Sequence, residues 1–220
     1  GIAYQEGNNR VGILFQEKWS RNFTYRTKEI CHEIQEKTKE VMGFDVSMGI
    51  GKWVKKPEEL IQSHDMAAQT LQYRYLLGGN LLIDMEEQHP VQEIAIEDDL
   101  AELKEAMKTG QKEQVYQILI KIEDSIRQAL MEKSRACMYL QQVIRTMDNA
   151  CEDVSADMDR IREDRDELLR QITDQKFFED ACKVVQKHTD RIFEILSELN
   201  TSSSKRQARL AIDYIQKNYM

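Results

Sequence analysis

The side chains of this 220-residue chain best suited to bind a metal ion or to act as nucleophiles are four histidines and four cysteines. The histidines are His32, His64, His89 and His188, and the cysteines are Cys31, Cys137, Cys151 and Cys182. No two histidines stand four residues apart, the spacing that brings two imidazoles of one helix to one metal, and no two cysteines have the Cys-x-x-Cys spacing of a zinc or redox site. We therefore expect no metal, no cofactor and buried free thiols.

Motifs for phosphate binding and for hydrolysis are also missing from the sequence. The glycine pair Gly78-Gly79 stands where a helical pattern ends and a strand begins, whereas a phosphate-binding loop leads from a strand into a helix. We interpret the pair as a helix C-terminus. The acidic run from Glu152 to Glu167 interleaves with arginines, which is typical of a solvated helix face. Since no Gly-x-Ser-x-Gly turn and no Walker-type loop occurs, the sequence predicts a protein that is not an enzyme.

The composition is typical of an ordered, helix-rich protein. Hydrophobic residues make up 41% of the chain and charged residues 32%, and there are only two prolines. The formal net charge of -8 disfavours a surface that binds phosphates, so nucleic acid is not an expected partner of this segment. No stretch is long and apolar enough to span a membrane, and the amino end lacks the features of a signal peptide. We expect a cytoplasmic location with no membrane contact by this segment.

Residues 1–90 are predicted to form an α+β domain with the element order β-β-α-β-α-β. The strand patterns "IAYQ" and "VGILFQ" flank the turn-rich "EGNN" and predict a hairpin. A long helix is expected from Ser20 to Met42, with Gly43 ending it. A strand in "FDVSMGIG", a helix that begins at Pro57 and a strand in "LLIDM" complete the order. We expect one sheet with helices laid on it, an α+β sandwich.

Residues 91–203 are predicted to be an all-α helical bundle or coiled-coil region, because apolar residues recur there with helical spacing. A first short helix is expected to stop at Gly110, and two longer helices follow it. A last helix is expected from Lys176 to Leu199. Residues 204–220 carry a further, separate helical pattern after the polar run Ser202–Ser204. Each apolar stripe must be buried against another helix or a second chain.

A heptad pattern with alternating three- and four-residue spacing crosses the middle of the helical region. Its members, which we predict to form a dimerisation seam, are Val154, Met158, Ile161, Arg165, Leu168 and Ile172. Two interpretations stay open: one helix of an intramolecular bundle, or a coiled coil between two chains. An arginine in the seam lowers stability and can fix the register of the pairing. The second interpretation predicts a homodimer.

The first region resembles the later part of a GGDEF-type nucleotide-cyclase domain whose first strand and helix are missing. The matching pieces are "EGNNRVGILF", "VSMGIG" and "SHDMAAQTLQYRYLLGGN" followed by "LLID". In that family the hairpin turn carries Gly-Gly-(Asp/Glu)-Glu-Phe, whose carboxylates hold divalent metal. The residues at these positions are Gly7, Asn8, Asn9, Arg10 and Val11. Because a cation stands where the metal would bind, the resemblance implies a degenerate hairpin without cyclase activity.

The chain as a whole resembles the central part of AraC-type response regulators of the YesN kind. The resemblance is carried by "IQSHDMAAQTLQYRYLLGGNLLIDMEE", "EDDLAELKEAMKTGQKEQVYQILIKI" and "RQARLAIDYIQKNYM". Two-component regulators of this kind have a receiver domain, a degenerate GGDEF-like domain, a helical segment and two helix-turn-helix motifs. The resemblance implies that residues 204–220 begin a truncated DNA-binding domain, whose missing part would bind DNA. It also implies a receiver domain and a sensor kinase upstream in a phosphorelay.

These expectations combine into a relay function without catalysis. The heptad-bearing helices would pair two chains and thereby set the separation of two DNA-binding domains, which controls promoter binding. Three alternatives stay open. The chain is the middle of a membrane-anchored AraC-type regulator, a helical adaptor for another protein, or a GTP-binding descendant of a cyclase.

Overall fold

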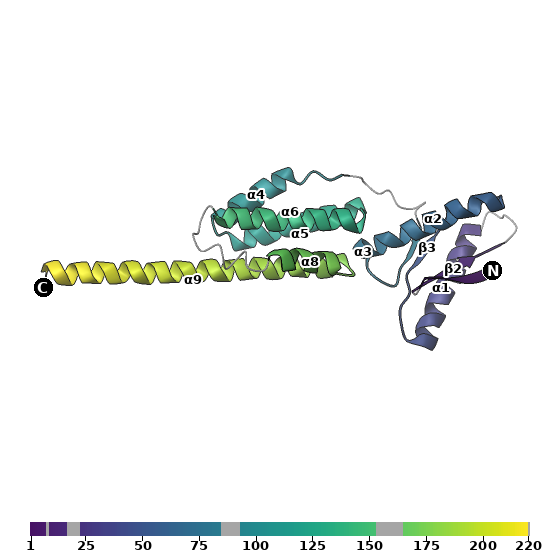
Figure 1. Ribbon diagram of the computed structural model, residues 1–220, viewed down its shortest axis with the longest axis horizontal. Helices are drawn as coiled ribbons and strands as arrows, with labels where there is room; N and C mark the ends of the chain where they lie inside the picture. The colour runs from purple at the N-terminus through teal and green to yellow at the C-terminus, as the bar shows by residue number, and fades with distance from the viewer. Residues whose placement is uncertain (8, 17–22, 85–92, 153–164, 220) are drawn as a thin grey trace. The chain divides into compact units, whose positions relative to one another are not determined.

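The computed structural model describes residues 1–220 except 8, 17–22, 85–92, 153–164 and 220, and it describes the backbone but not the side chains of residues 199–219. The chain divides into two units. Unit 1 comprises Gly1–Gln92 with Arg127–Lys133, and unit 2 comprises Glu93–Ile126 with Ser134–Met220. Unit 1 mixes short strands with helices, whereas unit 2 is helical (Figure 1). The prediction of a mixed α/β part followed by a helical part is confirmed at this level.

Unit 1 begins with the predicted hairpin, which is confirmed. Strand β1 (Ile2–Glu6) pairs antiparallel with β2 (Arg10–Leu14). Gly7 in the turn has φ +67°, a left-handed conformation that glycine adopts without a steric penalty. The ring of Tyr4 covers its cross-strand partner Gly12, where a Cβ atom would overlap the ring. The backbone therefore favours glycine at position 7, whereas a larger residue at position 12 would displace the ring of Tyr4.

Helix α1 (Phe23–Met42) ends where the sequence predicts. Gly43 follows it with φ +74°, and its N–H donates to the carbonyl oxygen of Lys39 at 3.0 Å. The side-chain amide of Gln35 in α1 donates to the carbonyl oxygen of Val46 at 2.9 Å. This bond ties α1 to the segment that leads into strand β3 (Met48–Ile50).

The predicted second helix is a helical run with an internal 3₁₀ turn. Its parts are η1 (Pro57–Glu59), α2 (Leu60–Thr70), η2 (Leu71–Tyr73) and α3 (Arg74–Leu77). Helix α2 approaches β3 closely because the strand region carries glycines. A Cβ atom on Gly49 would overlap the carbonyl oxygen of Ala67, and one on Gly51 would overlap that of Ser63. Gly78 ends the run with φ +97°, as predicted for a helix C-terminus.

The four described strands form two separate two-stranded sheets, so the expectation of one sheet is wrong for the described residues. Strand β4 (Leu82–Asp84) pairs parallel with β3, and β1 pairs with β2. Strands β3 and β4 are only three residues long, which limits the ladder they can build. The hairpin contacts α2 through Tyr4 and Glu6, instead of extending the β3–β4 pair. The order of the elements along the chain was nevertheless predicted correctly.

Residues 1–92 bury few large side chains. Their buried apolar side chains, among the described residues, are Cys31, Tyr75, Leu76 and Ile83. Their exposed large apolar side chains are Ile2, Tyr4, Val11, Tyr25, Val41, Met42, Phe44, Ile61 and Leu77. Because buried apolar area is the main favourable term in folding, this part has a weak core.

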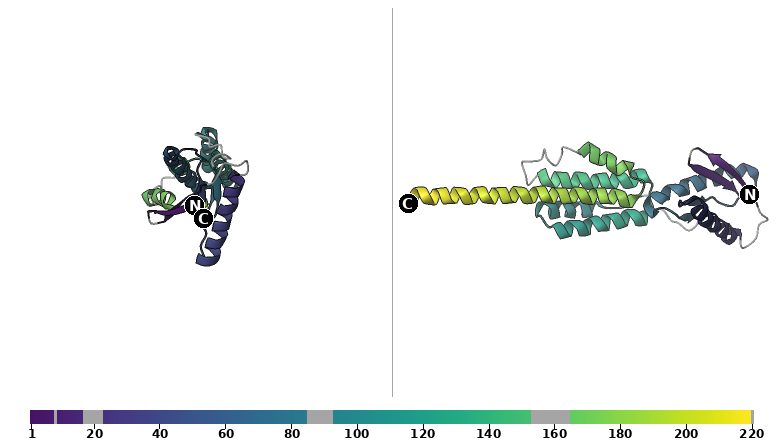
Figure 2. Two further views of the ribbon diagram at one scale, coloured as in Figure 1. Left: turned by 90° about the vertical axis from the view of Figure 1, so that its right-hand side faces the viewer. Right: turned by 90° about the horizontal axis from the view of Figure 1, so that it is seen from below.

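Unit 2 is a bundle of helices (Figures 1 and 2). Each of its described helices buries at least one apolar side chain. Its described helices are α4 (Glu97–Lys108), α5 (Lys112–Ala129), α6 (Lys133–Glu152), α8 (Arg165–Asp174) and α9 (Phe178–Tyr219). Gly110, with φ +70°, separates α4 from α5 as predicted. The largest fully buried side chains include Leu103, Met107, Ile122, Ile126, Leu140, Ile144, Met147, Ile172, Phe178 and Ile192. Each such burial contributes about 1.5–3 kcal/mol, so unit 2 has a substantial core.

Helix α9 is continuous over 42 residues. The expectation that a helix ends at Leu199 and a separate one follows Ser202–Ser204 is wrong. No glycine or proline occurs between Phe178 and Tyr219, and serine is only mildly unfavourable in a helix, so nothing in the sequence stops it. The helix continues beyond the other helices of the unit (Figures 1 and 2). Among the described residues, none of the helices combines the length and the apolar content needed to cross a lipid bilayer.

Candidate functional site

The hairpin turn that the resemblance aligns with a cyclase metal site has no acidic side chain among its described residues. Gly7 and Asn9 lie in the turn, and Arg10 and Val11 open strand β2 with exposed side chains. Asn8 lies outside the described residues. An arginine in place of a metal-binding carboxylate repels a divalent cation. The described part of the turn therefore offers no ligand set for the metal of a cyclase.

Glu6, the acidic residue next to this turn, is engaged by His64 of α2. Its Oε2 atom lies 3.3 Å from Nε2 of His64, and Oδ1 of Asp65 lies 3.3 Å from Nδ1 of the same ring. Hydrogen bonds to Asp65 and then to Glu6 raise the pKa of His64. The ring of Tyr4 stands nearby, with its centroid 6.5 Å from that of His64. His64 thus fastens the hairpin to α2, most strongly when the imidazole is protonated.

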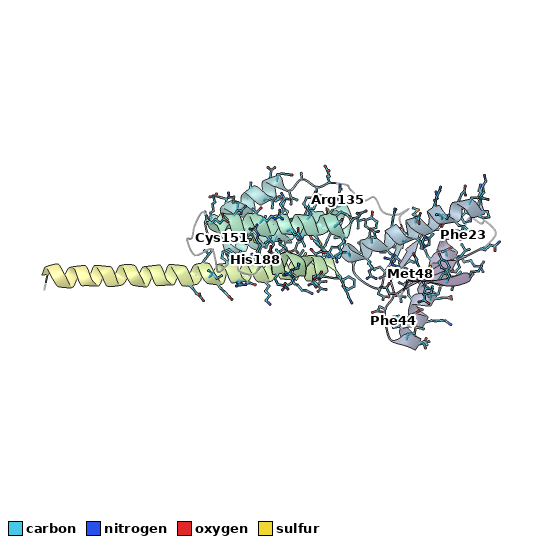
Figure 3. The ribbon with its side chains drawn as sticks, viewed as in Figure 1. Phe23, Phe44, Met48, Arg135, Cys151 and His188 are labelled. Atoms are coloured by element: carbon cyan, nitrogen blue, oxygen red, sulfur yellow. The ribbon has the colours of Figure 1, made fainter. Side chains whose placement is uncertain are left out.

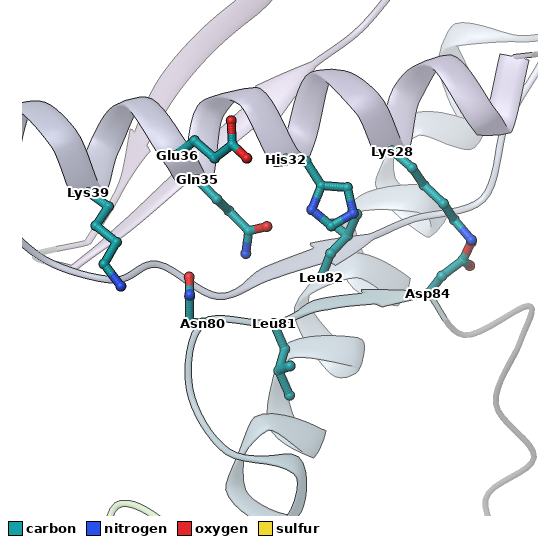
Figure 4. Close-up of a pocket in the computed structure, with 9 residues that line it drawn as sticks. All are labelled: Lys28, His32, Gln35, Glu36, Lys39, Asn80, Leu81, Leu82 and Asp84. Atoms are coloured by element: carbon teal, nitrogen blue, oxygen red, sulfur yellow. The ribbon is translucent and has the colours of Figure 1, made fainter.

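A groove of about 470 Å³ runs along α1 and β4 in unit 1 (Figure 4). Its lining residues are Lys28, His32, Gln35, Glu36, Lys39, Asn80, Leu81, Leu82 and Asp84. Cationic and anionic side chains alternate along this lining, so the groove has no single sign of charge that would select an anionic or a cationic ligand.

Several charged groups of this groove already have partners within the protein. Nζ of Lys28 lies 3.2 Å from Oδ2 of the buried Asp84, and Nζ of Lys39 lies 3.0 Å from Oδ1 of Asp45. His32 is exposed at the groove. Within the described ranges, no group of three or more His, Cys, Asp or Glu side chains is placed to hold a metal ion. The groove therefore has the character of a surface hollow braced by ion pairs.

The described half of the predicted dimerisation seam lies on α8. Ile172 is fully buried in its own chain and Leu168 is half-buried. Arg165 points toward α6, where its Nε atom lies 3.6 Å from Oδ2 of Asp148. The seam residues outside the described ranges are Val154, Met158 and Ile161. The residues that can be placed contact the same chain, and pairing with a second chain stays a prediction.

Asp148 of α6 and His188 of α9 form a buried hydrogen-bonded contact in unit 2. Their Oδ1 and Nε2 atoms lie 3.0 Å apart, and their side chains are 1% and 6% exposed. Figure 3 labels His188 and Cys151 among the side chains of this bundle. Beside them, the hydroxyl of Thr189 donates to the carbonyl oxygen of Val185 at 2.9 Å. Because an unpaired buried charge costs several kcal/mol, Asp148 depends on His188 and Arg165.

This buried pair was missed by the reasoning from the sequence. Asp148 stands four residues after Ile144, and His188 stands three residues after Val185, so both occupy positions on apolar stripes. A polar residue at a core position on each of two helices was the available signal, because buried polar groups nearly always have a partner.

A second polar group joins the first turns of α5 to α9. The hydroxyl of Tyr116 donates to Oδ1 of Asp190 at 2.7 Å, and Nζ of Lys112 lies 3.0 Å from the same oxygen. Nζ of Lys112 also stands 5.8 Å from the ring centroids of Tyr116 and Phe193. Burial and the hydrogen bond to Asp190 raise the pKa of Tyr116 to about 12. Hydrogen bonds from Tyr116 and Lys112 lower the pKa of Asp190.

The four cysteines are free and buried, as predicted. Burial raises the pKa of Cys31. Burial and the nearby charge of Asp148 raise the pKa of Cys151 to about 12. Because the thiolate is the nucleophilic form, neither of these thiols is prepared for nucleophilic catalysis near neutral pH.

Comparison with protein-family models, with curated proteins and with solved structures found no match. The arguments for a function therefore come from the sequence and the geometry. Two polar groups of unit 2 connect its helices: the core pair Asp148–His188 and the group of Tyr116, Lys112 and Asp190. Both hold α9 against another helix of the bundle.

Proposed function

We propose that this chain is the signal-relay and dimerisation region of a bacterial AraC-family transcription regulator, with no catalytic activity of its own. The observation that carries the proposal is the continuity of α9 from Phe178 in the bundle core to Tyr219. Its last part contains "AIDYIQKNY", the stretch that resembles the opening helix of an AraC-type DNA-binding domain. In the proposal, one helix joins a packed core to a DNA-binding element.

A continuous helix is a suitable relay because it is rigid. Each backbone N–H is bonded to the carbonyl four residues earlier, so a rotation at one end is passed to the other. Within the bundle α9 is fixed by buried Phe178 and Ile192 and by the contacts of His188 and Asp190 with α6 and α5. A rearrangement that rotates this packed part would rotate everything that follows Leu199.

Unit 1 enters the proposal as a degenerate GGDEF-like domain that has lost its chemistry. The features that support this are Arg10 at a position where the family has a carboxylate, and Glu6, which is taken up by His64. We expect no heat of binding when GTP and Mg²⁺ are titrated into the chain in a calorimeter. Metal-dependent binding of GTP would support a cyclase descendant instead.

The dimer in this proposal sets the distance between two DNA-binding domains. Regulators of this kind bind two half-sites whose spacing follows from the geometry of the protein dimer. We expect a concentration-dependent dimer in sedimentation velocity. A chain that remains strictly monomeric at high micromolar concentration would contradict the dimerisation part of the proposal.

The relay can be tested by changing the phase of α9 in the complete regulator. Two alanines inserted after Ser203 would rotate the following part by about 200°, whereas seven would rotate it by about 700°, which returns it to within about 20° of its original direction. We expect the two-residue insertion to abolish the response of promoter binding to the signal, and the seven-residue insertion to retain it. A response that is the same in both variants would contradict a relay through α9.

A further inference from the structure

Helix α8 packs against α9, and it meets α6 near each of its two ends. All ten of its residues are described, and Ile172 is the one that is fully buried. Against α6, Arg165 meets Asp148 at 3.6 Å, and Sγ of Cys137 lies 3.8 Å from the carbonyl oxygen of Ile172. Because these two contacts occur in opposite order along the two helices, α8 runs antiparallel to α6. An apolar anchor at one end and an ion pair at the other hold the two helices together.

The ion pair at the start of α8 joins a buried partner to a more exposed one. The side chain of Asp148 is 1% exposed and that of Arg165 is 30% exposed. Oδ1 of Asp148 contacts Nε2 of His188 in α9. Among the described residues, Oδ2 is buried, makes no hydrogen bond and has Arg165 as the cation that faces it. Removal of Arg165 would therefore take away the described charge opposite a buried oxygen, whereas the Asp148–His188 contact would remain.

We propose that Arg165 and Asp148 form a latch, and that α8 is a releasable cover over Cys137. With the latch closed, Ile172 lies over Cys137, whose side chain is 4% exposed. Opening breaks the contacts of α8 with α6 and α9 and uncovers the thiol, while the contacts among α5, α6 and α9 remain. Local openings of this kind are the low-energy excursions of a folded protein. The latch does not depend on the proposed dimerisation.

Thiol labelling of the full chain tests the latch, because Cys137 reports whether α8 is closed. The variant is Arg165→Met, and the matched control is Arg170→Met, which removes a cation that is 71% exposed and pairs with Glu167 of the same helix. Labelling with iodoacetamide is followed residue by residue by mass spectrometry. We expect Arg165→Met to raise the labelling rate of Cys137 roughly tenfold, and the control to leave it within about twofold of the original rate. Equal rates in the two variants would overturn the latch.

Hydrogen exchange of the unaltered chain provides a second test that does not depend on the folding of any variant. The amides of α8 from Leu168 to Thr173 are expected to exchange at least tenfold faster than those of α5 from Val115 to Ile122, because opening of α8 does not require unfolding of the core. Equal protection of the two helices would mean that α8 opens only with the whole unit. That result would overturn the proposal.

Discussion

The hydroxyl oxygen of Tyr116 lies 2.7 Å from Oδ1 of Asp190, and this contact joins the first turns of α5 to α9 two residues before the buried Ile192. Lys112 contacts the same carboxylate oxygen at 3.0 Å. The side chains of Lys112 and Asp190 are 45% and 52% exposed, so solvent screens their attraction. The contact therefore contributes modestly to stability, and it orients α9 near the end of its buried part.

Replacement of Asp190 by Asn should lower the free energy of unfolding by about 0.5–1 kcal/mol at neutral pH. The folded-state pKa of Asp190 is lowered, first by the hydrogen bond from Tyr116 and then by that from Lys112. A carboxyl group whose pKa is lower in the folded protein contributes its full stabilisation at pH values above its pKa in the unfolded chain, about 3.9. This stabilisation is lost as the pH falls through the pKa of the group in the folded protein. In urea unfolding, the difference in the free energy of unfolding between the original protein and Asp190→Asn should therefore decrease at acidic pH.

Glu194→Gln is the control for the Asp190 substitution, because it removes an exposed carboxylate four residues further along the same helix. It should change stability by less than about 0.5 kcal/mol at any pH. A gap between the original protein and Asp190→Asn that widens on acidification would contradict the proposed role of the Tyr116 and Lys112 contacts.

Replacement of Asp148 by Asn should destabilise unit 2 by about 3 kcal/mol. The substitution removes the charge that faces Arg165 and a carboxylate oxygen that contacts His188, and breaking a buried pair typically costs this much. Far-UV circular dichroism during urea titration measures the effect. Asp174→Asn on the exposed face of α8 is the control and should be nearly neutral. A loss below about 1 kcal/mol for Asp148→Asn would show that its charge is not needed in the core.

Replacement of His64 by Gln should weaken the attachment of the hairpin to α2 in a pH-dependent way. Hydrogen bonds to Asp65 and Glu6 raise the folded-state pKa of His64. A histidine whose pKa is higher in the folded protein contributes its full stabilisation at pH values below its pKa in the unfolded chain, about 6.5. This stabilisation is lost as the pH rises through the pKa of the histidine in the folded protein. The variant should therefore differ most from the original protein below the pKa of an unfolded histidine, and less and less as the pH rises through the raised folded-state pKa. Proteolytic cleavage of the hairpin over this pH range measures the difference.

If His64→Gln were cleaved at the same rate as the original protein at every pH, the attachment through His64 would be contradicted. His32→Gln is the matched control, since His32 is an exposed histidine of the same unit. It should leave the pH profile of cleavage unchanged.

Replacement of Gly51 by Ala should disrupt unit 1 more than replacement of Gly43 by Ala. A Cβ atom on Gly51 would overlap the backbone of α2 at Ser63, and backbone atoms cannot move aside cheaply. Gly43 has open space around its Cβ position but has φ +74°, so an alanine there costs only about 1 kcal/mol of strain. Fluorescence of Trp53 during urea unfolding should show the larger shift for Gly51→Ala. Equal shifts would mean that α2 does not pack on the backbone at Gly51, the residue that follows β3.

Local signals in the sequence predicted the order of the elements and several of their ends. The hairpin follows from alternating strand patterns on either side of a glycine-containing turn, and Gly43, Gly78 and Gly110 each follow a helix with positive φ. These features depend on a few neighbouring residues, so they can be read without knowledge of the tertiary structure.

Features that depend on distant residues could not be predicted in the same way. The strands form two sheets, and the hairpin docks on α2 through Glu6, Tyr4 and His64, a contact between residues far apart in the sequence. The contact of Asp148 with His188 spans 40 residues. The polar run Ser202–Ser204 predicts a break in the helix, but a serine run without glycine or proline can continue a helix when the preceding part is fixed by packing.

The uneven burial in the two units leads to a last prediction, that they unfold in separate transitions. Among the described residues of Gly1–Gln92 the buried apolar side chains are Cys31, Tyr75, Leu76 and Ile83, whereas the buried residues of α6 alone include Leu140, Val143, Ile144 and Met147. Since each buried side chain of this size contributes about 1.5–3 kcal/mol, unit 1 should unfold at the lower urea concentration.

Both tryptophans of the chain, Trp19 and Trp53, belong to Gly1–Gln92, so their fluorescence reports on unit 1. The helical signal in circular dichroism comes largely from the long helices of unit 2. We expect the fluorescence midpoint to precede the circular dichroism midpoint by at least about 1 M urea. Val143→Ala, which creates a cavity in the core of unit 2, should lower the second midpoint and leave the first in place. Coincident midpoints that move together in this variant would show that the two units unfold as one cooperative body.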